Sequence, residues 1–202
     1  MNNKEKMISE LPYKAWLDGL EEDRLICKEK LYKYNNLNPR KKEKIKKVMR
    51  SILGGCGDNF VIEPPFRCDY GKNIRIGNNF YSNYNCTILD CAPVTIGDNV
   101  LFGPNVSIFT AGHPVHPEIR NEGYEYAIKI NIGNNVWIGG NTVVNPGVTI
   151  GDNVVIGSGS VVTKDIPSNS IAIGNPCRVI REVNDEDKKF YFKDREFIKD
   201  EN

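Results

Sequence analysis

The chain contains two histidines, His113 and His116, which lie three residues apart in the segment GHPVHPE. Histidine changes its charge near neutral pH, so it is the commonest general base of enzymes that work there. We predict that His113 is a general base, whereas an ordinary surface position explains His116 equally well. A catalytic zinc ion normally takes three protein ligands. Two histidines disfavour a metal site, because a cysteine or carboxylate would have to complete the set.

Positive side chains towards the carboxyl end are candidates for contact with a phosphorylated cofactor. Lys164 occurs in VVTKDIP, and Arg178 and Arg181 occur in GNPCRVIREV. Arginine and lysine both bind phosphate oxygens through charge-assisted hydrogen bonds. The basic run at 40–50, RKKEKIKKVMR, is more typical of a solvated helix face than of a phosphate site.

Length and charge limit the classes of function. The 202 residues suit one domain with a core and a small appendage, and 27 Lys and Arg nearly cancel 26 Asp and Glu. No global field therefore favours nucleic acid or membrane as a partner. No apolar segment approaches the ~18 residues of a membrane span, and MNNKEKMISELPY lacks the apolar stretch of a secretory signal. We expect a cytoplasmic protein whose cysteines are reduced thiols, since no CxxC pair occurs among Cys27, Cys56, Cys68, Cys86, Cys91 and Cys177.

Four segments of the chain are near copies of one another: IRIGNNF at 74–80, VTIGDNV at 94–100, INIGNNV at 130–136 and VTIGDNV at 148–154. Their starts are 20, 36 and 18 residues apart. Because 36 is twice 18, and 20 is 18 plus a two-residue bulge, we predict that the chain advances by one structural unit every 18 residues and that the longest interval holds two units.

A six-residue rhythm runs inside these units. The aliphatic residues that carry it are Ile132, Ile138, Val144, Ile150, Ile156 and Val162. Neither an α-helix nor an amphipathic strand has a period of six. The rhythm predicts a triangular coil with one short strand on each side, aliphatic residues inside, and Gly, Asn or Asp at the corners.

Two regions interrupt the rhythm. Residues 5–53 carry helical spacing, which predicts two or three short helices capping the open end of the coils. Residues 114–129 fall where a corner should be, so they must project as a loop. We therefore divide the chain into a helical cap at 1–55, coils at 56–176 with a projecting loop at 113–129, and a tail at 177–202 that forms a helix or an extended arm.

Several segments together resemble the maltose and galactoside O-acetyltransferases, which belong to the left-handed parallel β-helix acyltransferases. They are TAGHPVHPE at 110–118, NNVWIGGNTVVNPGVTIGDNVVIGSGSVVTKDIP at 134–167, GNPCRVIRE at 174–182, IEPPFRCDYG at 62–71 and the helical cap. The resemblance implies a mainly β fold, a left-handed parallel β-helix of hexapeptide repeats with an N-terminal α-helical cap. It also implies a homotrimer that transfers acetyl from acetyl-CoA directly to a sugar hydroxyl, with no metal and no covalent enzyme intermediate.

The same resemblance implies roles for individual residues. His113 matches the general base, and Asn83 matches the asparagine that orients and stabilises the reacting centre. Asp69 and Tyr81 match acceptor-pocket positions. Positions along the coenzyme A groove are matched by Trp137, Gly140, Ser158, Thr163, Lys164, Arg178 and Arg181.

The acceptor side departs from the galactoside branch of the family. Ala15 and Cys91 stand where that branch has acidic residues. Glu125 stands where the galactoside branch has an apolar residue and the maltose branch an acidic one. These acceptor positions favour a maltose or glucoside acceptor. The tail NDEDKKFYFKDREF is more similar to the galactoside branch, so the resemblance does not decide the acceptor.

Coil arithmetic bears on how the site is assembled. Asn83 lies nine residues after Ile74, in the middle of its coil, whereas His113 lies 19 residues after Val94, one residue into the next coil. This spacing places the two about half a turn apart, with the aliphatic core between them. If both are catalytic, His113 of one subunit must face Asn83 of a neighbour, as a closed trimer allows.

Three alternatives remain at this stage. The acceptor of an acetyltransferase could be a non-sugar hydroxyl or an amine. Carbonic anhydrases of the gamma type use the same coil, but they resemble one another in placing three histidines on a metal, and this chain has two. A non-enzymatic scaffold gives no reason for a histidine-bearing loop beside a basic carboxyl end.

Overall fold

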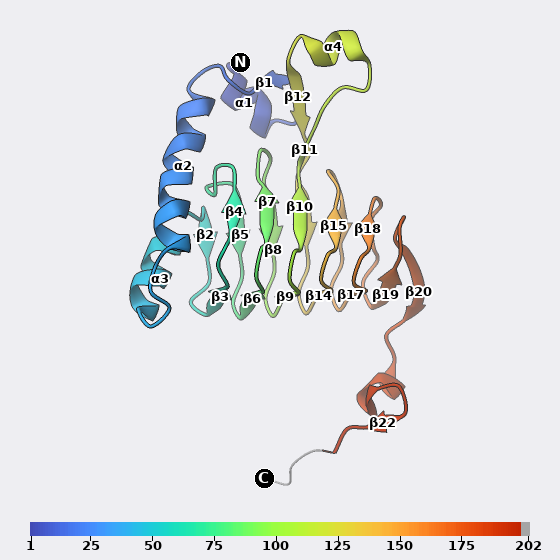
Figure 1. Ribbon diagram of the computed structural model, residues 1–202. Helices are drawn as coiled ribbons and strands as arrows, with labels where there is room; N and C mark the ends of the chain where they lie inside the picture. Colours follow the sequence, from blue (N-terminus) through green and yellow to red (C-terminus); the bar gives the residue numbers. More distant parts are fainter. Residues whose placement is uncertain (199–202) are drawn as a thin grey trace.

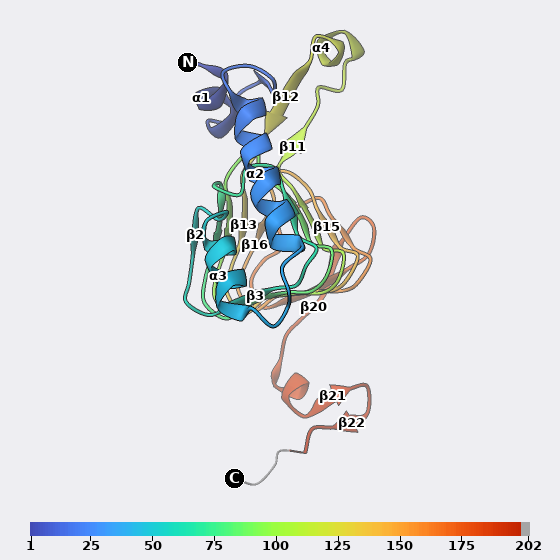
Figure 2. The same cartoon turned by 60° about the vertical axis from the view of Figure 1, so that its left-hand side comes forward.

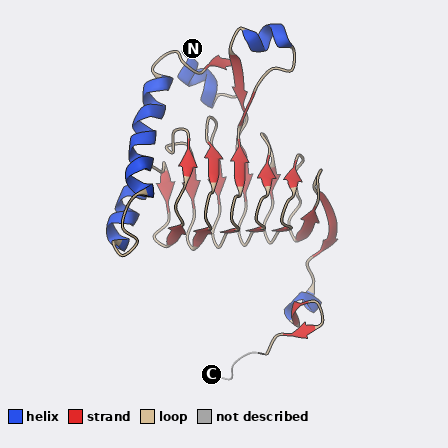
Figure 3. Cartoon of the chain, viewed as in Figure 1, coloured by secondary structure: helices blue, strands red, loops and turns tan. Residues whose placement is uncertain are grey.

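The computed structural model describes residues 1–198, and its central feature is a stack of coils made of short parallel strands (Figure 1). Each coil contributes one strand to each of three sheets, which form the sides of a triangular prism. Figure 3 shows the short strands of successive coils lying side by side along the stack. The first side contains β2 (Gly55–Cys56), β5 (Ile74–Ile76), β8 (Val94–Ile96), β13 (Ile130–Ile132) and β16 (Thr149–Ile150). The second contains β3 (Phe60–Ile62), β6 (Phe80–Ser82), β9 (Leu101–Phe102), β14 (Trp137–Ile138), β17 (Val155–Ile156) and β19 (Ser170–Ile173). The third contains β4 (Arg67–Cys68), β7 (Thr87–Leu89), β10 (Ser107–Phe109), β15 (Val143–Val144) and β18 (Val161–Val162).

The six-residue rhythm is confirmed as the pattern of the core. The aliphatic residues from Ile132 to Val162 at this spacing are each at most 3% exposed. The residues four positions after them are also buried, including Thr142 and Ser160, whose hydroxyls donate to backbone carbonyls. The parallel β-helix predicted from the repeats is therefore correct, with each coil covering the aliphatic residues of the next.

The interval of 36 residues between repeats holds one coil and not two. β8 pairs directly with β13, so Val94 lies opposite Ile130. The remaining residues of the interval do not join the stack. After β10 in the third side they form a projecting ribbon of β11 (Ala111–Gly112), the short helix α4 (Pro117–Asn121) and β12 (Tyr124–Ala127). The interpretation of 36 as two units is wrong, because this ribbon projects from the stack between two strands that are neighbours in the sheet (Figure 1).

The projecting segment is ordered by strand pairing. β12 pairs antiparallel with β11 and with β1 (Tyr13–Lys14) from the N-terminal segment, forming a three-stranded sheet. Gly112 lies against the ring of Tyr126, and a Cβ at that position would come 2.5 Å from the ring. The residue before His113 is therefore held tightly at the foot of the ribbon.

Three helices precede the coils: α1 (Asn3–Ile8), α2 (Leu20–Asn35) and α3 (Lys42–Arg50). α2 and α3 cover the end of the stack formed by β2, β3 and β4 (Figure 2). The Asn35 side chain bonds both the N–H and the C=O of Phe66 at 2.9 and 3.0 Å. Leu25 and Ile26 of α2 are 52% and 43% exposed, because the buried face of this helix runs through Leu20, Cys27, Leu31 and Tyr34. No described helix is both long and apolar enough to cross a membrane.

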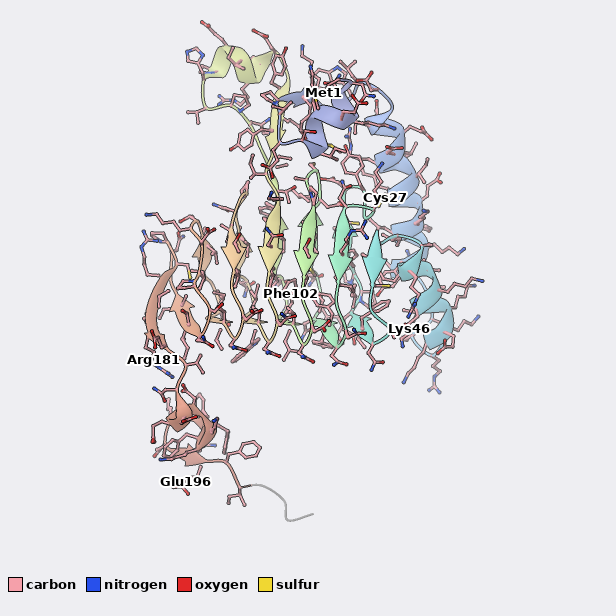
Figure 4. The ribbon with its side chains drawn as sticks, turned by 180° about the vertical axis from the view of Figure 1, so that it is seen from behind. Met1, Cys27, Lys46, Phe102, Arg181 and Glu196 are labelled. Carbon is pink, nitrogen blue, oxygen red and sulfur yellow. The ribbon has the colours of Figure 1, made fainter. Side chains whose placement is uncertain are left out.

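The tail begins with a strand, and the residues after it extend away from the stack (Figure 1). β20 (Arg178–Glu182) pairs antiparallel with β19, and Arg181 in Figure 4 marks this strand. A 3-10 turn (Asp185–Lys188) and a hairpin of β21 (Phe190–Phe192) and β22 (Arg195–Glu196) follow. The last four residues of the predicted tail, 199–202, lie outside the described residues.

A column of asparagines runs along the first corner, between the first and second sides. Its members have left-handed backbone angles, φ between 56° and 59°, and are Asn79, Asn99, Asn135, Asn153 and Asn169. Their side chains hydrogen-bond one another from coil to coil at 2.8–3.2 Å. Asparagine suits this corner because it tolerates the left-handed region and its amide both donates and accepts.

Replacing Asn135 with alanine is expected to lower the free energy of unfolding by about 2 kcal/mol, because alanine strains the corner and removes two side-chain hydrogen bonds. The expected fall in Tm is about 4–8 °C for a chain of this size, measured at fixed protein concentration. Asn135→Gly is the matched control, since glycine keeps the backbone angle without strain. A glycine variant at least as unstable as the alanine variant would contradict the backbone part of this account.

Candidate functional site

The predicted catalytic residues lie at two different corners of the prism. Asn83 follows β6 at the second corner, between the second and third sides, where its N–H donates to Phe102 O at 3.0 Å. Its Oδ1 accepts the N–H of Tyr84 at 2.8 Å, which leaves Nδ2 as the group able to donate to a bound molecule. His113 is exposed and follows β11, beyond the third corner, which lies between the third and first sides.

Within one chain, the third side separates Asn83 from His113. β7 and β10 run from the second corner to the third, and their inward residues Ile88 and Ile108 are buried in the core. The estimate of half a turn is too large, because the two residues lie at the two ends of one side. The underlying conclusion, that one chain does not bring them together, agrees with these positions.

Three of the predicted acceptor residues do come together at the third corner. The Cys91 thiol donates to Asp69 Oδ2 at 3.5 Å. Glu125, on the ribbon, accepts a 3.0 Å hydrogen bond from the hydroxyl of Tyr13. Tyr81 lies apart from them, on the outward face of β6 in the second side.

Burial controls the charge of Asp69. Burial raises the pKa of Asp69 above its usual range, while the Cys91 thiol and the charge of Arg24 partly offset the shift. Arg24 itself reaches from α2 and donates to the hydroxyl of Tyr70 at 2.7 Å. In its ionised form the Asp69 side chain is a strong hydrogen-bond acceptor for hydroxyl groups.

Asp90 fixes the turn that carries Asp69, a role the sequence analysis missed. Its carboxylate is fully buried and accepts the N–H groups of Asp69, Tyr70 and Asn73 at 3.0, 2.8 and 3.3 Å. Burial raises the pKa of Asp90 to about 7, and the backbone donors act in the opposite direction. The sequence feature that could have indicated this role is an acidic residue directly after β7, a strand that packs against the core.

The thiols near the site are poor nucleophiles. Cys86 is fully buried, and burial raises its pKa to about 12. Burial also raises the pKa of Cys91, and the nearby Asp69 charge adds to the effect. Because the thiolate is the reactive form, neither cysteine is poised to carry an acetyl group near neutral pH.

The predicted cofactor residues divide between the same two corners. Gly140 and Ser158 lie in turns at the second corner, beside the exposed Trp137 on β14. Thr163 and Lys164 follow β18 at the third corner.

The two remaining cofactor residues lie on β20, at the C-terminal end of the second side. Arg178 is exposed there. Arg181 is paired through both guanidinium nitrogens with Asp187, at 2.6 and 2.8 Å. Arg178 is thus the arginine of this strand without a carboxylate contact among the described residues.

The second side carries an exposed apolar row. Val61, Leu101 and Trp137 are 49%, 47% and 54% exposed, and Tyr81 lies in register between the first two. The corresponding row of the first side is polar, with Arg75, Thr95, Asn131 and Thr149 in register. A contiguous apolar surface beside the second corner is typical of a face that another molecule covers.

The described residues contain no candidate metal site. Across residues 1–198, no group of three or more His, Cys, Asp or Glu side chains is placed to hold a metal ion. Neither His113 nor His116 lies in such a set. The three-ligand arrangement of a zinc hydratase is therefore not assembled within the described part of one chain.

Family models match three parts of the chain. Residues 6–57 match the maltose acetyltransferase hexapeptide capping motif, and residues 129–164 match the bacterial transferase hexapeptide (six repeats). Residues 93–115 match the hexapeptide repeat of succinyl-transferase. The matches cover the cap and the coils on both sides of the ribbon.

Whole-chain comparisons extend these matches. The chain is 55% identical over 177 residues to galactoside O-acetyltransferase of Escherichia coli (strain K12), covering 88% of this chain and 87% of the relative. A solved galactoside acetyltransferase in complex with coenzyme A superposes with a TM-score of 0.95 at 50% identity, covering 98% of this chain and all of that chain. A maltose O-acetyltransferase from Clostridium difficile 630 superposes with a TM-score of 0.90 at 49% identity, covering 92% and 99%.

Proposed function

Because the chain belongs to the family of maltose and galactoside O-acetyltransferases, we propose that it acetylates a hydroxyl of a maltose-, glucose- or galactoside-type sugar. As a member of this family it is an acetyl-CoA-dependent acyltransferase, and acetyl-CoA is its co-substrate. The observation that carries the sugar proposal is the gathering of Asp69 and Glu125 at the corner from which the His113 ribbon projects. Carboxylates recognise sugar hydroxyls by accepting their hydrogen bonds.

The chemistry assigned to His113 is general-base catalysis. Its imidazole takes the proton of the sugar hydroxyl as the oxygen attacks the thioester carbon. The new C–O bond forms, the C–S bond breaks, and the departing sulfur of coenzyme A takes the proton back from the imidazolium. The unreactive thiols Cys86 and Cys91 support direct transfer over an acetyl-enzyme.

Asn83 stabilises the reacting centre in this proposal. Its Nδ2 donates to the oxygen that gains negative charge, in the manner of an oxyanion hole. Backbone N–H groups of the glycine and serine turns at the second corner are further donors for that oxygen, and Gly140 and Ser158 lie in those turns.

We assign the site to the junction of two subunits in a homotrimer. Asn83, Trp137, Gly140 and Ser158 lie on or beside the second corner, whereas His113, Thr163 and Lys164 follow the third. A closed ring of three prisms brings the second corner of each subunit beside the third corner of the next. In this arrangement the contact between neighbouring subunits brings Asn83 beside His113. It also brings the cofactor residues of the second corner beside those of the third.

An acceptor panel tests the proposed function. The purified chain is incubated with acetyl-CoA and maltose, glucose, an alkyl galactoside, a simple alcohol or a primary amine, and thiol release is followed together with product mass. We expect thiol release to rise above the acceptor-free rate with at least one of the sugars, with one acetyl group added to the sugar. Acceleration by the amine alone would overturn the sugar assignment in favour of N-acetylation.

A further inference from the structure

Tyr13 joins the N-terminal segment to the third corner, where Asp69, Cys91 and Glu125 lie. It lies in β1, is fully buried, and is in register with Glu125 in the antiparallel pair β1–β12. Its hydroxyl donates to Glu125 Oε2 at 3.0 Å. The two residues are 112 positions apart in the chain, so this bond ties the cap segment to the ribbon.

The surroundings of Tyr13 are apolar except at the hydroxyl. The ring packs in a small core shared by the cap segment, the coils and the ribbon, with Met7, Leu20, Tyr70, Cys91, Ala92 and Ala127. Cys91 neighbours the hydroxyl and its thiol contacts Asp69, so one run of contacts leads from Glu125 through Tyr13 and Cys91 to Asp69. Tyr13 is therefore the link between the carboxylate of the ribbon and the carboxylate of the coils.

The hydroxyl does more than packing requires. A buried tyrosine must find a hydrogen-bond partner, and the backbone carbonyls of a sheet are the usual choice. Tyr34, the other fully enclosed tyrosine of the cap, follows this rule and donates to the backbone oxygen of Ile62. Tyr13 instead donates to the half-buried carboxylate of Glu125, which makes no other side-chain hydrogen bond among the described residues.

We propose that Tyr13 is a positioning residue for the acceptor: its hydroxyl holds the Glu125 carboxylate at a fixed place opposite Asp69. The inference rests on the proposed function, because it requires Glu125 and Asp69 to bind the acceptor. A sugar then meets two carboxylates at a set separation, one from the ribbon and one from the coils. The residues assigned to acetyl-CoA lie on or directly after β14, β17 and β18, or on β20, and none belongs to β1 or to the ribbon.

Tyr13→Phe is the principal test, since it removes only the hydroxyl. We expect the KM for the sugar acceptor to rise by about three- to tenfold, the effect of freeing one charged hydrogen-bonding partner. The turnover number and the KM for acetyl-CoA should change by less than about twofold. Tyr34→Phe is the matched control, because it removes the hydroxyl of an equally buried cap tyrosine that does not reach Glu125.

A double-mutant cycle separates positioning from general stability. In a Glu125→Ala background the Tyr13→Phe change should no longer raise the acceptor KM, because the carboxylate it holds is gone. If Tyr13→Phe raises the KM by the same factor in both backgrounds, or raises the KM for acetyl-CoA equally, the role is structural and the inference is wrong. Thermal unfolding of each variant accompanies the kinetics.

Failure of the proposed function gives a different pattern from failure of this inference. If the wild-type chain acetylates none of the sugars, the function itself fails. If the wild type is active, Glu125→Ala raises the acceptor KM and Tyr13→Phe does not, only the positioning role of Tyr13 is refuted. If Glu125→Ala leaves the acceptor KM unchanged, Glu125 is not an acceptor ligand and the role of Tyr13 falls with it.

Discussion

Replacing His113 with alanine is expected to lower turnover by about 10²–10⁴-fold, with the KM for acetyl-CoA nearly unchanged. The loss follows from removing the proton acceptor for the sugar hydroxyl, while the residues assigned to acetyl-CoA, on β14 and in the turns after β14, β17 and β18, stay in place. Steady-state kinetics with saturating sugar, followed by thiol release, measure the effect. Folding should be preserved because the His113 side chain is exposed.

His116→Ala is the control for His113. His116 is also exposed and is the N-cap residue that precedes α4 on the same ribbon, where its side chain makes no capping hydrogen bond. Its replacement should leave turnover within about threefold of wild type. Near-normal turnover of the His113 variant, or equal losses in the two variants, would show that the base lies elsewhere.

Replacing Asn83 with alanine is expected to lower turnover by about 10²–10³-fold, the usual effect of removing one donor from an oxyanion site. The loss should appear in kcat more than in either KM, because charge develops on the accepting oxygen only during the reaction. Asn83→Asp refines the test: it keeps the shape and the acceptor for the Tyr84 N–H but replaces the free donor with negative charge.

The two Asn83 variants together identify the role of the side chain. Asn83→Asp should be at least as slow as Asn83→Ala, because a carboxylate repels the developing oxyanion. An aspartate variant that keeps wild-type turnover would show that Nδ2 makes no contribution to the reaction. Circular dichroism and thermal unfolding check that the turn at the second corner remains intact.

The parts of the fold that repeat were predictable from local spacing. In a stack of coils each inward position recurs every six residues, so the aliphatic ladder from Ile132 to Val162 marks the core directly. The corner asparagines were equally readable, since few residues adopt a left-handed backbone without strain. These features follow from neighbours in the sequence and need no knowledge of distant contacts.

The number of coils was not predictable from spacing. The repeats before and after the ribbon keep their register, because β8 and β13 pair as though nothing lay between them. An insertion of nearly one coil length therefore resembles an additional coil. The angular estimate for His113 failed for the same reason, since the chain had already left the prism at β11.

The parts of the candidate site that the sequence did not predict depend on contacts between residues far apart in the chain. Tyr13 and Glu125 meet through an antiparallel pairing between segments 112 positions apart in the chain, and no local sequence pattern predicts that pairing. Asp90 is similar, because its carboxylate accepts hydrogen bonds from three backbone N–H groups in the turn between β4 and β5, about 20 residues earlier in the chain. Asp69, Cys91 and Glu125 were named from family resemblance, and their proximity became visible only in three dimensions.

A subunit-mixing experiment tests most directly the claim that each site joins His113 of one subunit to Asn83 of the next. The inactive His113→Ala and Asn83→Ala proteins, carrying tags of different mass, are mixed in equal amounts, dissociated and reassembled, and mixed trimers are verified by native mass spectrometry. With random assembly about one quarter of the interfaces regain both wild-type residues, so about one quarter of wild-type activity should return. Verified mixed trimers with no more activity than the parent variants would show that each site is built within a single chain.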